Sequence, residues 1–285
     1  MKKLDYTSKN KVLMEEIRMI DWLNNFIDSA LLIDAGRRII LSLILLAIML
    51  GLSRWQHTDL EGSFIYGFIR GLVQIVLLGF ILVIIFSLQS LLLLYIILSL
   101  MIVFAAASTR RTHKYPKVFE IELAGIAVAS YTIMTIVIVL GIIPVKGEYV
   151  IPLGGMVISN SMALSLIAME RIYSDLEHKK GMVEAAIALG ATPRKAMNSI
   201  IRDAIRASLL PSTNRMAILG IVSIPGLMSG MIIGGMNPII AAIYQIIIFL
   251  MIISSGFIAD IIVSYYIIKI VFDPNGALKP DYSIE

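Results

Sequence analysis

Five polar side chains lie inside long apolar stretches of the sequence, where an unpaired charge is costly and usually serves a function. They are Arg70, Gln74, Asn160, Gln245 and Asp260. Oxygen atoms such as those of Asn160, Gln245 and Asp260 are the ligands that hard and borderline metal cations prefer. We therefore interpret the five residues as candidates for the translocation pathway of a small solute.

Arg70 and Gln74 are four residues apart and share one helical face. They would line the pathway or a seam between two copies of the chain. Alternatively, Arg70 reaches toward the membrane surface while Gln74 bonds a neighbouring helix. The positive charge of Arg70 would repel a metal cation, so this residue fits an anion or an acidic partner better.

Acidic residues are rare in the apolar stretches. Asp260 is the one acid that we expect in the middle of a stretch. Glu120 and Glu122 stand near Lys117 at the expected edge of another stretch. Exposed ion pairing is the ordinary explanation for acids in such a position.

The chain contains 16 methionines and no cysteine. Several methionines are concentrated in two apolar stretches, at Met156, Met162, Met228, Met231 and Met236. Thioether sulfur prefers soft cations such as Cu(I) to iron, but methionine is also a flexible filler of apolar helices, and we favour that interpretation. The lack of cysteine excludes disulfides and thiolate metal sites, and the three histidines are too dispersed for a zinc cluster. The sequence assigns no metal ligand.

The elements that carry these residues follow from the composition. Of 285 residues, 58% are apolar and only 15% are charged, against roughly 25% charged residues in a soluble domain. Seven stretches are nearly uninterrupted in their apolar character: 39–52, 64–86, 91–107, 122–143, 150–168, 216–235 and 239–268. Most reach the ~20 residues that a helix needs to cross a bilayer. We predict an all-α polytopic membrane protein with about seven transmembrane helices.

The distribution of Lys and Arg predicts the orientation of these helices. Of the 24 basic residues, four lie in 108–118 and eight in 170–215, whereas the connections between them contribute only Lys146. The rich segments are expected in the cytoplasm, which places the C-terminus inside and the N-terminus outside. The net charge of +4 is then an orientation signal, and no nucleic-acid partner is expected.

The chain is expected to have two parts, an N-terminal leader over residues 1–36 and a permease domain over residues 37–285. The leader places apolar residues at roughly helical spacing from Val12 to Leu32. This pattern predicts an amphipathic helix at the membrane interface. A short helix packed on the rest of the protein is the alternative.

The segment 170–215 is the only long polar connection, and its local signals predict a helix, a turn and a second helix. The first helix covers 182–189, and Gly190 suits the left-handed conformation that ends a helix. Thr192 then caps the second helix, and Pro193 fits its first position.

The second helix is expected to have an apolar face and a charged face that includes Arg202, Asp203 and Arg206, and to end at Leu210-Pro211. One interpretation is a helix lying on the inner leaflet with its basic face toward the lipid headgroups. The other interpretation follows from the order of residues along the whole segment. Glu184-Ala185-Ala186 followed by Gly190 resembles the EAA loop of ABC-transporter permeases, which implies a cytoplasmic amphipathic coupling segment that contacts an ATP-binding subunit.

A small-residue stripe in the sixth apolar stretch is a candidate hinge. Gly226, Gly230 and Gly234 recur every four residues, and Pro225 precedes them. Such a stripe permits close helix contact, and proline breaks or kinks a helix. The break could transmit cytoplasmic motion to the pathway, although packing alone also explains it.

Seven motifs together resemble the FetB family of membrane permeases, the bacterial iron-export type whose plant relatives are linked to aluminium tolerance. The motifs are residues 70–74, 155–162, 189–193, 201–207, 221–230, 234–238 and 244–246. The resemblance runs over most of the chain from about Phe64, and the leader lies outside it.

The resemblance implies an ABC-type transporter in the plasma membrane, built from two copies of this permease and two of a separate ATP-binding protein, with iron or another metal ion exported. The chain has no G-x-x-x-x-G-K-[ST] motif, so ATP and Mg²⁺ are expected on the partner, with no cofactor and no enzymatic site on this chain. The alternatives are transport of a nucleotide sugar or another anion, a gradient-driven secondary transporter, and a membrane scaffold that does not transport.

Overall fold

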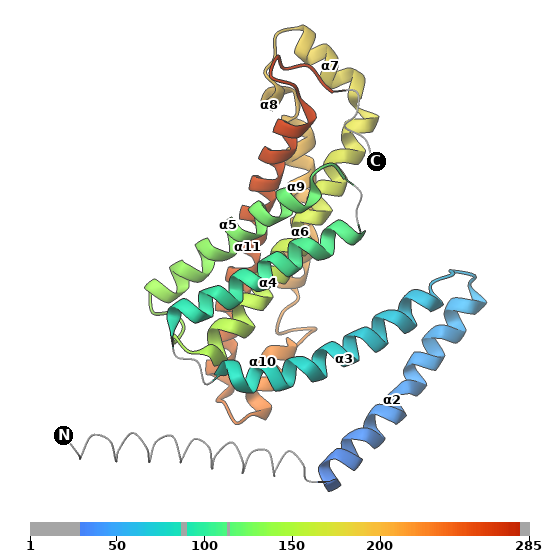
Figure 1. Cartoon of the computed structure of the whole chain (residues 1–285), viewed down its shortest axis with the longest axis vertical. Helices are drawn as coiled ribbons and strands as arrows, with labels where there is room; N and C mark the ends of the chain where they lie inside the picture. The colour runs from blue at the N-terminus through green and yellow to red at the C-terminus, as the bar shows by residue number, and fades with distance from the viewer. Residues whose placement is uncertain (1–28, 87–89, 113–114, 280–285) are drawn as a thin grey trace, which may run out of the picture. The chain divides into compact units, whose positions relative to one another are not determined.

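The computed structural model describes residues 29–86, 90–112 and 115–279, and every regular element in those ranges is a helix (Figure 1). The chain divides into two compact units, unit 1 up to Phe80 and unit 2 from Ile81 onward. Six of the described helices are long and apolar enough to cross a membrane. The expected class, an all-α polytopic membrane protein, is confirmed.

Unit 1 contains α2 (Ser29–Trp55) and most of α3 (Glu61–Phe86). Residues 29–36 of the expected leader belong to α2, and the amphipathic pattern up to residue 28 lies outside the described residues. Both helices expose large apolar side chains around their circumference, such as Ile40, Leu45 and Ile75. A helix that is apolar all round is suited to lipid or to burial against other membrane helices.

Unit 2 is a bundle of four long helices: α4 (Leu91–Thr112), α5 (Val118–Val139), α6 (Gly147–His178) and α11 (Pro238–Val271). The helices α6 and α11 make the most extensive contact, α5 packs on both, and α4 packs on α5 and α6. A core of buried aliphatic side chains, including Leu98, Ile126 and Val157, joins these helices.

Close approach between the long helices depends on glycine. A Cβ atom on Gly125 of α5 would stand 2.7 Å from Cγ2 of Val263 on α11. A Cβ atom on Gly256 of α11 would overlap Leu164 of α6. Small residues let membrane helices approach until their backbones nearly touch, and such packing replaces the hydrophobic driving force that lipid does not supply.

Four shorter helices connect α6 to α11: α7 (Lys180–Ala188), α8 (Pro193–Ala196), α9 (Asn198–Ala217) and α10 (Gly226–Ile233). Val183 of α7 and Ala196 of α8 pack against the C-terminal parts of α6 and α11. We name this end of unit 2 the α7–α8 end. Leu227 and Met231 of α10 pack near the N-terminal parts of the same two helices. We name this opposite end of unit 2 the α10 end. Helix α9 therefore starts at the α7–α8 end and runs along α6 and α11 toward the α10 end without reaching it (Figure 1).

The expected end of the second polar helix at Leu210-Pro211 is wrong, because α9 continues through Pro211 to Ala217. The buried residues Ile200, Ala204, Ser208 and Ser212 recur every four positions on both sides of the proline. Packing of this face on α6 and α11 holds the helix together despite the hydrogen bond that proline removes.

The stretch 216–235, expected as one continuous span, is not a single helix. Helix α9 ends at Ala217, residues 218–225 are irregular, and α10 has only 8 residues. Gly220 takes a φ of +78° in the irregular part, and Pro225 caps α10. The return from the α7–α8 end to the α10 end is thus made by a polar helix, an irregular segment and a short apolar helix.

We expect Gly125→Ala to destabilise unit 2, because Val263 has a branched, stiff side chain and overpacking typically costs about 1–3 kcal/mol. Gly181→Ala is the matched control, since Gly181 lies in α7 and a Cβ atom added to it would meet no described atom within 4 Å. Thermal unfolding of the purified variants measures the difference. Equal midpoints for the two variants would show that the α5–α11 contact is looser than described.

Candidate functional site

Four polar side chains from four helices meet inside unit 2. They are Glu122 of α5, Ser165 of α6, Ser208 of α9 and Asp260 of α11, and all four are fully buried. Ser165 donates its hydroxyl to Oε2 of Glu122 at 2.7 Å, and Ser208 donates to Oδ2 of Asp260. We name this group the Glu122–Asp260 site.

The two carboxyl groups lie on facing helices near the contact between α5 and α11. The contact at Gly125 explains this proximity, because Glu122 lies one turn before Gly125, and Asp260 directly follows Ala259, which Gly125 faces. One oxygen of each group, Oε1 of Glu122 and Oδ1 of Asp260, has no hydrogen-bond partner among the described residues.

Among the described residues, no basic side chain forms an ion pair with this site. The ion pairs in this part of the chain all involve other acids, such as Asp175 with Arg171 and Lys179. An ionised carboxylate buried without a counter-ion is strongly disfavoured. The site is therefore suited to take up positive charge, as protons or as a cation held by carboxylate and hydroxyl oxygens.

The sequence interpretation of Glu122 as an edge residue with ordinary surface pairing is wrong. Helix α5 begins at Val118, so Glu122 lies a full turn inside it and is completely buried. The neighbouring positions Ile121, Gly125 and Ile126 are buried on the same face. A signal was present in the sequence, because the spacing of these residues puts Glu122 on the apolar face of the helix.

The other polar residues expected at membrane depth are not gathered around the Glu122–Asp260 site. Asn160 donates its Nδ2 to the backbone carbonyl of Ile252 at 2.7 Å and so ties α6 to α11. Gln245 is buried on α11, and its Oε1 has no partner among the described residues. It lies 15 positions from Asp260, about 22 Å along the helix. The pathway role of both residues stays a prediction.

Arg70 and Gln74 lie in unit 1 and are both exposed on α3. None of the ion pairs in the described parts of the chain involves Arg70. Their role in a pathway or at a seam between two copies also stays a prediction.

The local signals around Gly190 are confirmed. Helix α7 ends in a turn in which Ala191 donates to the carbonyl of Ala186 at 3.0 Å and Gly190 takes a φ of +87°. The hydroxyl of Thr192 accepts from the backbone N–H of Lys195 at 3.4 Å, and Pro193 occupies the first position of α8. We name residues 184–195 the coupling turn, after the coupling role that the sequence resemblance implies; that role stays a prediction.

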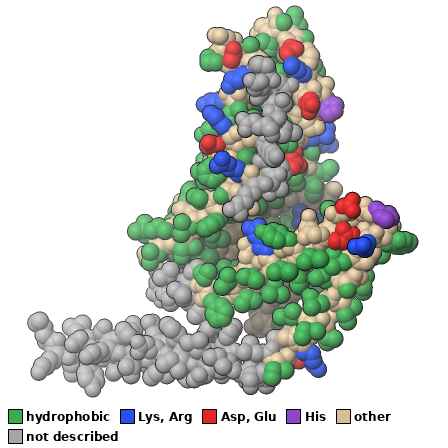
Figure 2. Space-filling model, turned by 45° about the vertical axis from the view of Figure 1, so that its right-hand side comes forward, with side chains coloured by type: hydrophobic (Ala, Val, Ile, Leu, Met, Phe, Trp, Pro, Cys, Tyr) green, Lys and Arg blue, Asp and Glu red, His purple; other side chains and the backbone are tan. Residues whose placement is uncertain are grey.

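The coupling turn is exposed at the α7–α8 end, where charged side chains gather at the top of Figure 2. Leu189 is 89% exposed at its tip. Glu184, Ala185 and Gly190 are exposed, and Ala186 is half-buried. An exposed, structured turn of this kind is a candidate docking surface for a protein partner.

The charged residues of α9 form an exposed edge next to the coupling turn. Arg202 and Arg206 are exposed, and Asp203 lies 3.9 Å from Nζ of Lys179 at the end of α6. Lys179 also contacts Asp175 at 3.4 Å. These ion pairs connect the start of α9 to the end of α6, although exposed pairs contribute little to stability.

The expected hinge residues lie at the two ends of α10 and within it. Pro225 is the N-cap of α10, and Gly234 is its C-cap. Added Cβ atoms on Gly226 and Gly230 would meet no described atom within 4 Å. This glycine stripe therefore makes no close helix contact inside the described chain, and its hinge role stays a prediction.

Comparison with known proteins identifies relatives over most of the chain. The model of a family described as "Uncharacterised protein family (UPF0014)" matches residues 37–272. The UPF0014 membrane protein YjkA of Bacillus subtilis is 30% identical over 240 residues, which cover 84% of this chain and 96% of the relative. No solved structure matches the chain.

Two further relatives have more specific names. Protein ALUMINUM SENSITIVE 3 of Arabidopsis thaliana is 31% identical over 230 residues, covering 79% of this chain and 82% of the relative. The probable iron export permease protein FetB of Escherichia coli is 29% identical over 226 residues, covering 79% of this chain and 87% of the relative.

We expect Asp260→Asn to leave the thermal unfolding midpoint unchanged or raised, because Asn keeps an acceptor for Ser208 and removes a buried charge. Asp260→Ala is expected to lower stability by about 2–4 kcal/mol, since it leaves a cavity and removes that acceptor. Unfolding of the purified variants in one detergent measures both effects. A loss with Asn as large as the loss with Ala would mean that the native carboxylate is ionised and well compensated.

Proposed function

Because the chain belongs to the UPF0014 family of membrane proteins, we propose that it is the permease subunit of an ABC-type transporter that exports iron or another metal cation across the plasma membrane. The name of the Escherichia coli relative, a probable iron export permease, supports the substrate and the direction. In this proposal two copies of the chain assemble with two copies of an ATP-binding subunit, which holds ATP and Mg²⁺.

The observation that carries the metal-cation part of the proposal is the Glu122–Asp260 site. Two buried carboxyls, each with an oxygen that has no partner among the described residues, form an environment that attracts cations and repels anions. This charge pattern favours a metal cation over a nucleotide sugar. It supports Asp260 as a pathway residue and adds Glu122 to the pathway.

Helix α9 offers a mechanical link between ATP hydrolysis and the Glu122–Asp260 site. It starts next to the coupling turn, and its Ser208 bonds Asp260 on α11. The C-terminal segment also lies against this region, since Gly276 is close to Pro193. A push on the coupling turn would shift α9 as a rigid rod and change the hydrogen bond at Asp260.

In this mechanism Glu184, Ala185, Ala186, Gly190 and Pro193 form the surface that meets the ATPase. Arg202, Asp203 and Arg206 flank that surface on the first turns of α9. The basic side chains also suit the cytoplasmic side of the membrane, which would place the α7–α8 end and the C-terminus in the cytoplasm.

A gradient-driven secondary transporter is the second candidate. The buried carboxyls favour it to the same degree, because such groups also carry protons in pumps and transporters. Dependence on a separate ATPase distinguishes the two candidates. Transport of metal by the chain alone in proteoliposomes with a proton gradient would favour the second.

For the complex of the chain with its ATP-binding subunit in nanodiscs, we expect Fe²⁺ to stimulate ATP hydrolysis. Glu122→Gln and Asp260→Asn should each reduce this stimulation at least tenfold, because a neutral amide binds a cation more weakly than a carboxylate. Glu177→Gln, which changes an exposed acid on α6, is the matched control and should retain it. Full stimulation in both buried variants would remove the Glu122–Asp260 site from the pathway.

We expect Gly190→Ala to uncouple ATP hydrolysis from transport. The left-handed φ of +87° at this position costs a residue with a side chain about 1–2 kcal/mol, which distorts the coupling turn without touching the buried bundle. Metal efflux per ATP hydrolysed, compared with that of Gly181→Ala, measures the effect. Membrane insertion of both variants is the control, and an unchanged ratio in Gly190→Ala would contradict the coupling role.

A further inference from the structure

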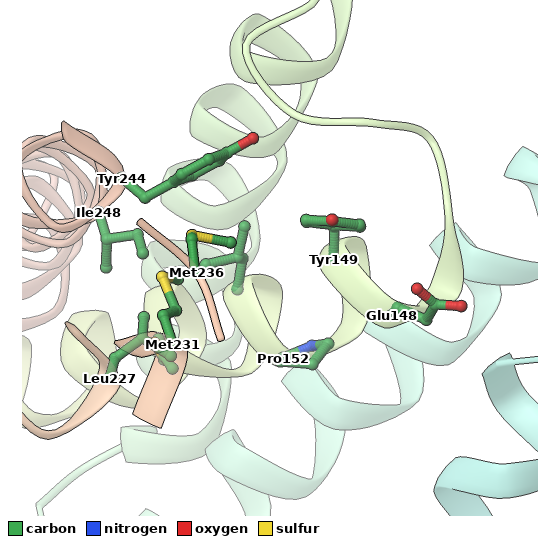
Figure 3. A pocket seen from close by; sticks show the side chains of 10 residues that line it. Glu148, Tyr149, Pro152, Leu227, Met231, Met236, Tyr244 and Ile248 are labelled. Atoms are coloured by element: carbon green, nitrogen blue, oxygen red, sulfur yellow. The ribbon is translucent and has the colours of Figure 1, made fainter. Parts of the chain in front are cut away.

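A pocket of about 180 Å³ lies at the α10 end of unit 2 (Figure 3). Its walls come from the N-terminal part of α6, from α10 with the turn that follows it, and from the N-terminal part of α11. Ile248 on its wall is 12 positions from Asp260 along α11, about 18 Å. The pocket is therefore separate from the Glu122–Asp260 site.

Three methionines from separate parts of the chain border this pocket: Met156 on α6, Met231 on α10 and Met236 in the turn before α11. All three are partly exposed rather than fully packed. These three side chains border a space that stays open, beside the aliphatic and aromatic side chains that make up most of its wall. Met156 and Met231 also pack against the core of unit 2, so they fill space on one side and border an open space on the other.

The backbone fixes two of the methionines next to each other. Helix α10 ends in a turn in which Gly235 takes a φ of +92° and the N–H of Met236 donates to the carbonyl of Met231 at 2.9 Å. This turn folds residue 236 back over residue 231. Figure 3 shows the two side chains adjacent to each other on one side of the pocket, between Leu227 and Tyr244.

The one formal charge among the described residues of the remaining, mostly apolar lining is negative. Among the described residues, Glu148 alone brings a formal charge to the pocket wall, and no Lys, Arg or His lines it. In the view of Figure 3, Glu148 lies on the far side of Tyr149 from the two methionines. A carboxylate on the pocket wall raises the local concentration of cations. The rings of Tyr149 and Tyr244 add faces that attract positive charge.

We propose that this pocket is a binding site for a soft monovalent cation, of the Cu(I) class, held by the thioether sulfurs of Met156, Met231 and Met236. Neutral thioethers select soft cations, whereas carboxylates and hydroxyls select hard and borderline ones. The site thus differs in chemistry from the Glu122–Asp260 site, and it goes beyond the proposed iron export. The flexible methionine side chains let the pocket contract around an ion much smaller than its empty volume.

The test uses Ag(I), an air-stable ion of the same class, and the purified full-length chain in nanodiscs without any ATPase. We expect one high-affinity Ag(I) per chain by isothermal titration in chloride-free buffer. The triple variant M156L/M231L/M236L, in which leucine preserves volume, should weaken binding at least tenfold. The double variant M182L/M216L changes two exposed methionines outside the pocket and should bind as the native chain does.

Protection from oxidation gives a second, residue-specific measurement. Bound Ag(I) should slow peroxide oxidation of Met156, Met231 and Met236 at least fivefold in peptide mass spectrometry, and leave Met182 and Met216 unprotected. Ag(I) binding that survives in the triple variant, equal protection of all methionines, or binding of an apolar dye in place of Ag(I) would each overturn the proposal. Because no nucleotide or ATPase is present, these outcomes are independent of the proposed transport function.

Discussion

The close approach of α5, α6 and α11 is the constraint on which unit 2 depends. Lipid tails are as apolar as leucine, so these helices gain stability from van der Waals contact rather than from leaving water. Gly125 and Gly256 permit that contact by leaving room for Val263 and Leu164. The same contact brings Glu122 of α5 beside Asp260 of α11, so the packing that stabilises the bundle also creates its buried charge.

Serine and amide side chains then connect the bundle through bonds between helices. Ser165 reaches α5, Asn160 reaches the backbone of α11, and Ser208 attaches α9 to α11. A serine hydroxyl that has no other partner can donate to a backbone carbonyl of its own helix. Such a hydroxyl can therefore lose its bond to a carboxylate at low cost in free energy. Bonds of this kind suit a protein whose helices must move against one another.

The sequence predicted the long helices well, because a long apolar stretch by itself indicates a membrane-spanning helix. It also predicted the turn at Gly190, where the cap, the glycine and the proline act locally. It did not predict the path of α9, because the charged residues Arg202 and Arg206 resemble a surface helix and only tertiary packing buries the opposite face. The position of Glu122 on the apolar face of its helix was readable from the spacing. The grouping of Met156 with Met231 depends on a contact between distant segments, which a single sequence does not encode visibly.

The composition of α9 has a consequence for how the protein is made. In 20 residues it carries three arginines and an aspartate, and each such charge opposes transfer from the translocon into lipid by about 2.5–3.5 kcal/mol at the centre of a helix. Its Ser208 finds its partner only on α11, which is synthesised later. Helix α9 also packs on α6, which precedes it in the chain, so α6 can hold α9 beside the bundle before α11 arrives. The bond between Ser208 and Asp260 is therefore among the last contacts of unit 2 that can form as the chain is synthesised.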